Sequence, residues 1–183
     1  KNPEILKFVT HHWSDHWNKG FDVYIKLDEL INSKKIDYKV EFTYIGNLPN
    51  ELNLKKTNHI NPLSGLDLAK EIKSHDIYIT ASINEPSGNH HIEASQCGLP
   101  VLYLNSGGIP EYCKGFGVSF NGLHDFENSL NEIIENFEIY SKKMENYPFN
   151  SIKMCKEFYT LFEQEVAKKS KKSNRRKKNI FRI

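Results

Sequence analysis

Residues 76–98 constrain the fold most, because they combine a strand, a polar loop and a helix within one short stretch. Apolar side chains alternate with Tyr and Thr over residues 77–81, a pattern typical of a strand in a sheet. Proline and glycine interrupt this pattern over residues 86–88, and Asn89 is a suitable N-cap for a helix that ends at Gly98. A strand–loop–helix unit of this kind is typical of parallel sheets.

The predicted helix start is a candidate anion site that two carboxylates bracket. The first backbone N–H groups of a helix have no partner within the helix, and the helix dipole is positive at this end. Glu85 precedes the predicted helix and Glu93 lies within it. An anion site between carboxylates suits a ligand that carries both phosphate groups and hydroxyl groups.

Strands and helices are expected to alternate along most of the chain, with short connections. This alternation predicts an α/β fold with a doubly wound parallel sheet and helices on both faces. The expected strands are residues 5–10, 38–45, 59–63, 76–82, 100–104 and 117–120. The expected helices are residues 21–33, 64–75, 89–98, 126–144 and 151–167, with one further short helix after the turn at residues 105–111.

Three polar loops follow three of these strands, at residues 11–20, 85–89 and 105–111. In a parallel sheet the carboxyl ends of the strands share one edge, and ligands bind there. We therefore expect the three loops to converge on one site.

Charge divides the chain into two parts, a folded domain at residues 1–167 and a basic tail at residues 168–183. The tail holds nine Lys and Arg and no acidic residue, whereas residues 1–167 hold 16 basic and 23 acidic residues, a net charge of about −7. The tail is too polar to form a core, so we predict that it is disordered. Contact with an anionic membrane surface, non-specific nucleic-acid binding and simple solvation all remain open for it.

The remaining composition favours a cytoplasmic protein, possible contact of the tail with a membrane aside. The sequence has no apolar run of about 18 residues and no recognisable signal peptide. Its three cysteines are scattered, which favours reduced thiols over a disulfide framework. The chain begins at Lys1 without a methionine, and we expect it to be a fragment of a longer protein.

Three sequence blocks, at residues 85–94, 97–101 and 107–111, resemble the donor-binding half of family 4 (group 1) glycosyltransferases of the GT-B fold. The first block contains Glu85 and Glu93 separated by seven residues, and the last reads Gly-Gly-Ile-Pro-Glu. The resemblance covers roughly residues 5–165 and implies a Rossmann-like domain. It also implies an amino-terminal acceptor domain, expected upstream or in a separate chain.

The resemblance implies a nucleotide-sugar donor, linked to UDP or GDP, with no separate cofactor and no metal ion. In such enzymes the pyrophosphate lies on the amino end of the helix after the first glutamate. Gly88 would allow the backbone to approach the phosphates, and the N–H groups of Asn89, His90 and His91 would donate hydrogen bonds to them.

The same resemblance assigns a role to each remaining site residue. Glu93 would accept hydrogen bonds from the ribose hydroxyls, and Glu85 would act as the catalytic carboxylate beside the anomeric carbon of the sugar. Lys19 would neutralise the phosphates of the leaving nucleoside diphosphate. Gly107 and Gly108 would contact the donor, although turn glycines with positive φ are an alternative explanation for them.

One departure from the family pattern concerns charge at the phosphate site. The family usually has an arginine shortly before the lysine, whereas this chain has His11 and His12 in that region. An arginine is always charged and offers a bidentate fork, whereas a histidine is charged only at lower pH. Either a histidine replaces the arginine, or stabilisation of the leaving group is weaker.

Five histidines at the expected site also raise the alternative of a zinc ion. Neighbouring histidines rarely ligate one metal together, and the sequence has no CxxC or HExxH pattern, so we predict no metal. The histidines concerned are His11, His12, His16, His90 and His91.

These observations predict a retaining glycosyltransferase that transfers a sugar from a nucleoside-diphosphate sugar to an unidentified acceptor. Retention of configuration is implied by the resemblance alone. One alternative is a non-catalytic nucleotide-sugar-binding module or subunit that needs a partner domain. A further alternative is a sugar-nucleotide epimerase on the same fold.

Overall fold

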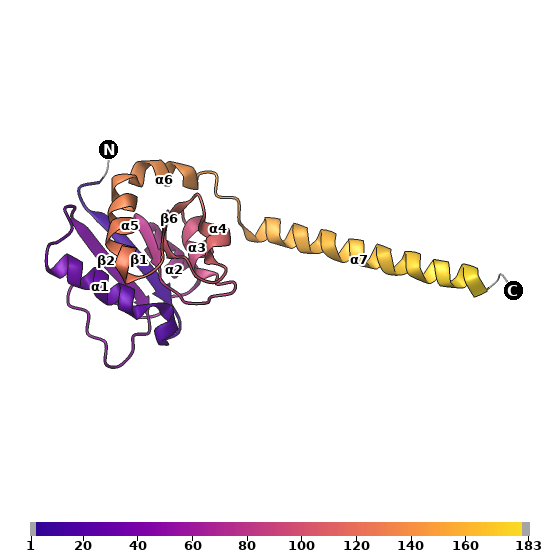
Figure 1. Cartoon of the computed structure of the whole chain (residues 1–183), viewed down its shortest axis with the longest axis horizontal. Helices are drawn as coiled ribbons and strands as arrows, with labels where there is room; N and C mark the ends of the chain where they lie inside the picture. The colour runs from indigo at the N-terminus through magenta and orange to yellow at the C-terminus, as the bar shows by residue number, and fades with distance from the viewer. Residues whose placement is uncertain (1–2, 181–183) are drawn as a thin grey trace. The chain divides into compact units, whose positions relative to one another are not determined.

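The structure, a computed structural model, describes the backbone of residues 3–180 and the side chains of residues 3–169. It divides the chain into two units, Lys1–Tyr147 and Pro148–Ile183, which we describe separately. The first unit is built around one sheet (Figure 1). Over its described residues, the second unit contains a single helix.

The sheet of the first unit has six parallel strands in the order β3-β2-β1-β4-β5-β6. The chain therefore builds outward from β1 in one direction and then from β4 in the other, which confirms the predicted doubly wound, Rossmann-like sheet. The change of direction lies between β1 and β4. The strands are β1 (Leu6–His12), β2 (Val40–Gly46), β3 (Asn58–Ile60), β4 (Ile77–Thr80), β5 (Val101–Leu104) and β6 (Gly117–Phe120).

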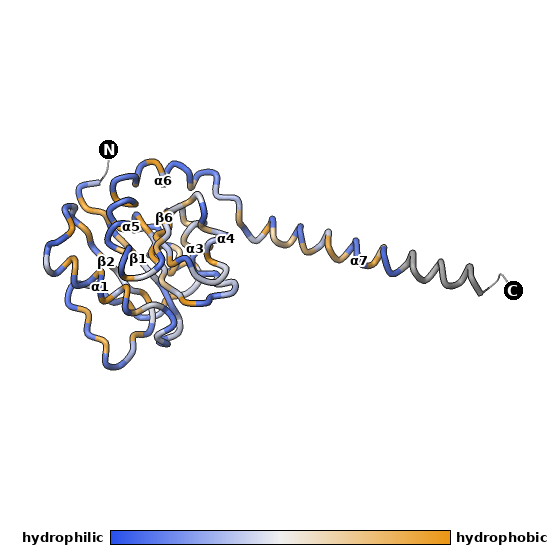
Figure 2. Tube along the Cα trace, viewed as in Figure 1, coloured by the Kyte–Doolittle hydropathy of each residue, from blue (hydrophilic) through white to orange (hydrophobic). Residues whose placement is uncertain are grey.

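Helices cover both faces of this sheet, because alternate residues of each buried strand point to opposite faces. One core cluster joins Phe8, Ile77 and Ile79 of the strands to α1 and α5, while the other joins Val9 and Tyr78 to α2, α3 and α4. Hydrophobic residues accordingly concentrate on the strands (Figure 2). The helices of the first unit are α1 (Phe21–Asn32), α2 (Gly65–Lys73), α3 (His90–Gln96), α4 (Ile109–Cys113), α5 (Leu123–Glu135) and α6 (Phe137–Met144), together with the 3-10 helix η1 (Trp17–Lys19).

Among the element boundaries that differ from the sequence prediction, two matter most for the description of this unit. β1 continues through His11 and His12, which were expected in a loop, because these residues pair with Ile45 and Gly46 of β2. The single helix expected at residues 126–144 is divided into α5 and α6 at Asn136. The Asn136 side chain donates to the Glu132 carbonyl oxygen at 2.9 Å, and such side-chain bonds compete with regular helical hydrogen bonding.

The second unit consists of α7 (Ser151–Ile180). The first unit ends at Tyr147, and the predicted domain boundary at residue 167 stays a prediction. The helix also continues beyond residue 168, where the sequence analysis predicts a disordered tail. The basic segment lacks glycine and proline, and Lys and Arg are good helix formers.

The predicted contact of the tail with an anionic membrane surface stays a prediction, because the side chains of residues 170–183 lie outside the described part. Over the residues that the structure describes, no helix is both long enough and apolar enough to cross a membrane.

Candidate functional site

A cavity of about 310 Å³ opens at the carboxyl ends of the strands around β1, where the direction of the sheet changes. Ligands of doubly wound sheets bind at this position. The apolar residues that line the cavity are Ile45, Pro62, Leu63 and Leu68. Its polar lining includes His11, His12, Lys19, His90 and Glu93.

Lys19 reaches the site from η1, which lies against the end of β4. Gly20 makes this close approach possible: it has a φ of 83°, and a Cβ atom there would lie 2.3 Å from Cβ of Ala81. The Ile83 N–H also donates to the Asn18 carbonyl oxygen at 2.7 Å. These contacts fix the backbone on both sides of Lys19.

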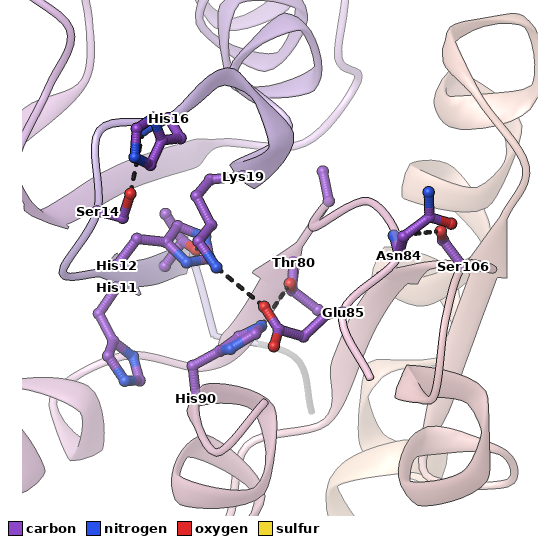
Figure 3. Close-up of polar contacts among 12 residues, drawn as sticks. His11, His12, Ser14, His16, Lys19, Thr80, Asn84, Glu85, His90 and Ser106 are labelled. Atoms are coloured by element: carbon purple, nitrogen blue, oxygen red, sulfur yellow. Dashed lines mark hydrogen bonds and ion pairs between the residues drawn. The ribbon is translucent and has the colours of Figure 1, made fainter. Parts of the chain in front are cut away.

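The side chain of Lys19 forms an ion pair with Glu85, with Nζ 2.9 Å from Oε2 (Figure 3). The two side chains are 19% and 21% exposed, so the pair is partly shielded from water. The structure thus brings together the predicted phosphate lysine and the predicted catalytic carboxylate. Lys19 is the only Lys or Arg among the described residues that line the cavity.

The glycine turn after β5 supports the Glu85 loop. The Gly108 N–H donates to the Glu85 carbonyl oxygen at 2.8 Å, and the Asn84 N–H donates to Oγ of Ser106 at 2.9 Å. A Cβ atom on Gly107 would lie 2.4 Å from that Glu85 oxygen. The contact that these glycines make is therefore with the Glu85 backbone, and their predicted contact with a donor stays a prediction.

Glu93 projects from α3 toward the end of β1, where it meets His11. The distance from His11 Nε2 to Glu93 Oε2 is 3.0 Å, and the Tyr78 hydroxyl lies 3.1 Å from the other ring nitrogen, Nδ1. A carboxylate only accepts hydrogen bonds, so Nε2 of His11 is the donor. This hydrogen bond holds the pKa of Glu93 below its ordinary value.

His12 is a buried, neutral imidazole. Its Nε2 lies 2.7 Å from the hydroxyl of Tyr24, which itself accepts the N–H of Ala81 at 3.3 Å. Burial, followed by the nearby charges of His11 and Lys19, keeps the pKa of His12 well below its ordinary value.

His90, the first residue of α3, is bonded to Thr80 of β4, with Nε2 2.8 Å from Oγ1 (Figure 3). Burial, together with His12 beside it, keeps the pKa of His90 well below its ordinary value. A Cβ atom on Gly88 would lie 2.7 Å from both the His90 ring and Cγ of Glu85. The space left by this glycine is thus filled by two site side chains, and its predicted approach to a phosphate is untested.

Unlike His11, His12 and His90, His91 does not line the cavity. It is fully buried, and neither ring nitrogen has a hydrogen-bond partner among the described residues. Burial lowers its pKa to about 4. Asn89, His90 and His91 occupy the amino end of α3, so their N–H groups have the position that the prediction requires.

The site therefore contains two hydrogen-bonded imidazoles, those of His11 and His12, in the region where the family pattern has an arginine. Among the described residues, no group of three or more His, Cys, Asp or Glu side chains is arranged to hold a metal ion.

Sequence analysis missed the residues that orient these histidines, namely Tyr24, Tyr78 and Thr80. They were assigned only to regular elements, although a buried tyrosine usually needs a partner for its hydroxyl. The need of each tyrosine hydroxyl for a hydrogen-bond partner was the signal in the sequence that could have identified Tyr24 and Tyr78.

Comparison with known proteins relates this site to one family. Residues 4–136 match the family described as glycosyl transferases group 1. D-inositol 3-phosphate glycosyltransferase of Paenarthrobacter aurescens is 25% identical over 136 residues, which are 66% of this chain and 33% of that protein. The enzyme of the same name from Pseudarthrobacter chlorophenolicus is 27% identical over 103 residues, 50% of this chain and 24% of that protein. The chain thus spans a third or less of these relatives.

Solved structures share the fold. The glycosyltransferase WaaG, involved in lipopolysaccharide biosynthesis, superposes with a TM-score of 0.63 and 17% identity over 80% of this chain and 42% of WaaG. The pneumococcal O-GlcNAc transferase GtfA, solved with UDP and GlcNAc, superposes with a TM-score of 0.65 and 14% identity over 88% of this chain and 36% of GtfA. Sucrose-phosphate synthase from Thermosynechococcus elongatus superposes with a TM-score of 0.66 and 14% identity over 91% of this chain and 47% of that protein.

The matched region contains the whole cavity lining and both carboxylates, Glu85 and Glu93. The chain belongs to the family of group 1 glycosyl transferases.

Proposed function

We propose that this chain is the donor-binding half of a retaining glycosyltransferase that uses a nucleoside-diphosphate sugar, linked to UDP or GDP. The carrying observation is that Lys19 and Glu93 line one cavity, where Lys19 pairs with Glu85 and Glu93 accepts a hydrogen bond from His11. A nucleotide sugar presents hydroxyl groups and a diphosphate to such a set.

Each part of the cavity has a matching part of the donor in this proposal. Glu93 accepts hydrogen bonds from the ribose hydroxyls, while Lys19 and the N–H groups at the amino end of α3 bind the diphosphate. The apolar wall that contains Ile45 and Leu63 receives the base. Glu85 lies beside the sugar, where its negative charge stabilises the positive charge that develops at the anomeric carbon.

Lys19 has a second task when the glycosidic bond to the diphosphate breaks. Negative charge then grows on the leaving phosphate and is neutralised by Lys19, which exchanged Glu85 for the diphosphate when the donor bound. This exchange leaves Glu85 unpaired at the moment when its charge faces the oxocarbenium-like sugar. The proposal assigns no step to a metal ion. An acceptor domain outside this chain supplies the second wall of the cleft.

Binding of nucleotides tests the proposal directly. We expect UDP or GDP to bind the chain in isothermal titration calorimetry, and a Glu93→Ala or Lys19→Ala variant to bind more weakly. Lys26→Ala is a matched control, since Lys26 pairs with Glu127 away from the cavity. The proposal is contradicted if UDP, GDP and their sugars all fail to bind, or if the Glu93→Ala variant binds them as tightly as the unaltered chain does.

A donor-binding module without activity of its own is the second candidate. It is favoured by the charge of the site, since Lys19 is the only Lys or Arg lining the cavity among the described residues and is already paired. Sugar transfer by the chain alone excludes the module. Transfer only after a second polypeptide is added supports it.

A further inference from the structure

We propose that His11 is a positioning residue that fixes the Glu93 carboxylate for the ribose of the nucleotide and so sets the preference for ribonucleotides over deoxyribonucleotides. This inference rests on the proposed function, because it assumes that a nucleotide occupies the cavity. It adds a role for a residue at which this chain departs from the family pattern.

Glu93 needs such a partner because of where it lies. Its side chain is 52% exposed on a short helix, so it would sample several rotamers in water. His11 is instead 11% exposed and belongs to a central strand of the sheet. The hydrogen bond of 3.0 Å from Nε2 to Oε2 therefore attaches a mobile carboxylate to a rigid element.

Tyr78 fixes His11 in turn. Tyr78 is fully buried in β4, and its hydroxyl lies 3.1 Å from Nδ1 of His11 and accepts the His11 backbone N–H at 3.2 Å. The two rings meet edge to face, with their centroids 5.5 Å apart. A chain of hydrogen bonds thus runs from the core through Tyr78 and His11 to Glu93 at the cavity.

The same geometry leaves part of the Glu93 carboxylate for a ligand. Oε2 carries the bond to His11, and Oε1 has no hydrogen bond to any residue that the structure describes. Each carboxylate oxygen accepts more than one hydrogen bond, so two ribose hydroxyls find acceptors without displacing His11. His11 therefore orients Glu93 without blocking it.

The contacts of His11 also argue against a role on the phosphate. Both ring nitrogens are engaged, Nε2 by Glu93 and Nδ1 by Tyr78. His11 has no remaining N–H group for an anion. It consequently does not replace the missing arginine at the diphosphate, and its effect is confined to the ribose.

The test compares nucleotides that differ only in the ribose. Dissociation constants of UDP and GDP, and of their 2′,3′-dideoxy counterparts, are measured with the full chain and its variants. His11→Phe keeps a ring but removes the hydrogen-bond donor to Glu93. We expect this variant to reduce the preference for the ribonucleotide about tenfold. His11→Gln keeps a donor near the Nε2 position, so it should retain most of this preference.

Two further variants separate positioning from folding. Tyr78→Phe removes only a hydroxyl and should lower the preference without changing the fold. Glu93→Gln should lower it most. The carboxyl signal of Glu93 in NMR gives a readout without nucleotide: the pKa of Glu93 should rise in the His11→Phe variant and stay low in the His11→Gln variant.

Several outcomes overturn the inference. A preference that is unchanged in both His11→Phe and Tyr78→Phe, while Glu93→Gln lowers it, shows that Glu93 needs no positioning. Equal weakening of the ribo and dideoxy forms shows a structural role only. If neither UDP nor GDP binds the unaltered chain, the proposed function fails first and the inference fails with it.

Discussion

The ammonium group of Lys19 lies 2.9 Å from the carboxylate of Glu85, although the two residues are 66 positions apart in the sequence. The proposed mechanism assigns Lys19 to the diphosphate and Glu85 to the sugar. In this ion pair each residue neutralises the other. A donor must take Lys19 away from Glu85 before either residue performs its task.

This ion pair predicts opposite effects for two substitutions at the same contact. Glu85→Gln removes the competing charge, so we expect UDP or GDP to bind about fivefold more tightly, equivalent to about 1 kcal/mol, while sugar transfer is lost. Lys19→Ala should weaken binding. Isothermal titration calorimetry measures the nucleotide affinity of both variants. Glu127→Gln, which breaks the Lys26 pair elsewhere, is the control and should change nothing. Weaker nucleotide binding by Glu85→Gln contradicts the prediction.

Buried histidines predict that the protein loses stability as the pH falls. Unfolded histidines take up a proton near pH 6.5, whereas His91 in the folded state does so only near 4, and the pKa values of His12 and His90 are lowered as well. The unfolded state therefore binds more protons below pH 6.5. The free energy of unfolding, measured with urea, should fall by up to about 1.4 kcal/mol per pH unit for each such histidine.

His91→Leu tests this explanation. His91 is fully buried, and neither of its ring nitrogens has a hydrogen-bond partner among the described residues, so an apolar side chain of similar size should cost no stability at pH 7.5. Between pH 6.5 and pH 5, the variant should lose less stability than the unaltered chain. An unchanged slope of unfolding free energy against pH would show that His91 does not contribute.

The glycine turn after β5 predicts a difference between two alanine substitutions. Gly107→Ala places a Cβ atom 2.4 Å from the Glu85 carbonyl oxygen, whereas Gly98→Ala meets no atom within 4 Å. Both glycines have positive φ, at 59° and 95°, so both variants carry backbone strain. Only Gly107→Ala should also displace the Glu85 loop and weaken nucleotide binding. Equal binding by the two variants would contradict this prediction, and their melting temperatures provide the comparison of stability.

Substitution of Asp28, which lies away from the cavity, should cause a large loss of stability. Its carboxylate accepts hydrogen bonds from the N–H groups of Lys55, Lys56 and Thr57 and from the Thr57 hydroxyl, at 2.7 to 2.8 Å. Asp28→Asn loses the charge and one acceptor, so the free energy of unfolding at pH 7 should fall by about 2–3 kcal/mol. Asp37→Asn, at an exposed position, should have little effect.

The contribution of the Asp28 carboxylate to stability should depend on pH. Burial alone would raise the pKa of Asp28, but these hydrogen bonds hold it below its ordinary value. Its stabilising contribution is therefore complete above the pKa of the unfolded chain, near 4, and is lost as the pH falls further. In urea unfolding, the difference between Asp28→Asn and the unaltered chain should shrink below that pH. A constant difference would contradict this assignment.

The sequence by itself determined the parallel sheet and the unit that contains Glu85 and Glu93. Local patterns are sufficient here, because strand alternation, turn residues and short connections admit few arrangements other than a doubly wound sheet. The same patterns placed Lys19 in a loop after the first strand. Even the convergence of these residues on one edge followed from the polarity of parallel strands.

Only the tertiary structure decided how these residues are paired. Whether Lys19 contacts Glu85, and His11 contacts Glu93, depends on how strands β1 and β4 lie beside each other and on the rotamers that this packing allows. Pairing with β2 also turned His11 from a loop residue into a strand residue. Local sequence encodes neither the partner nor the register, since both arise from contacts between segments that are far apart in the chain.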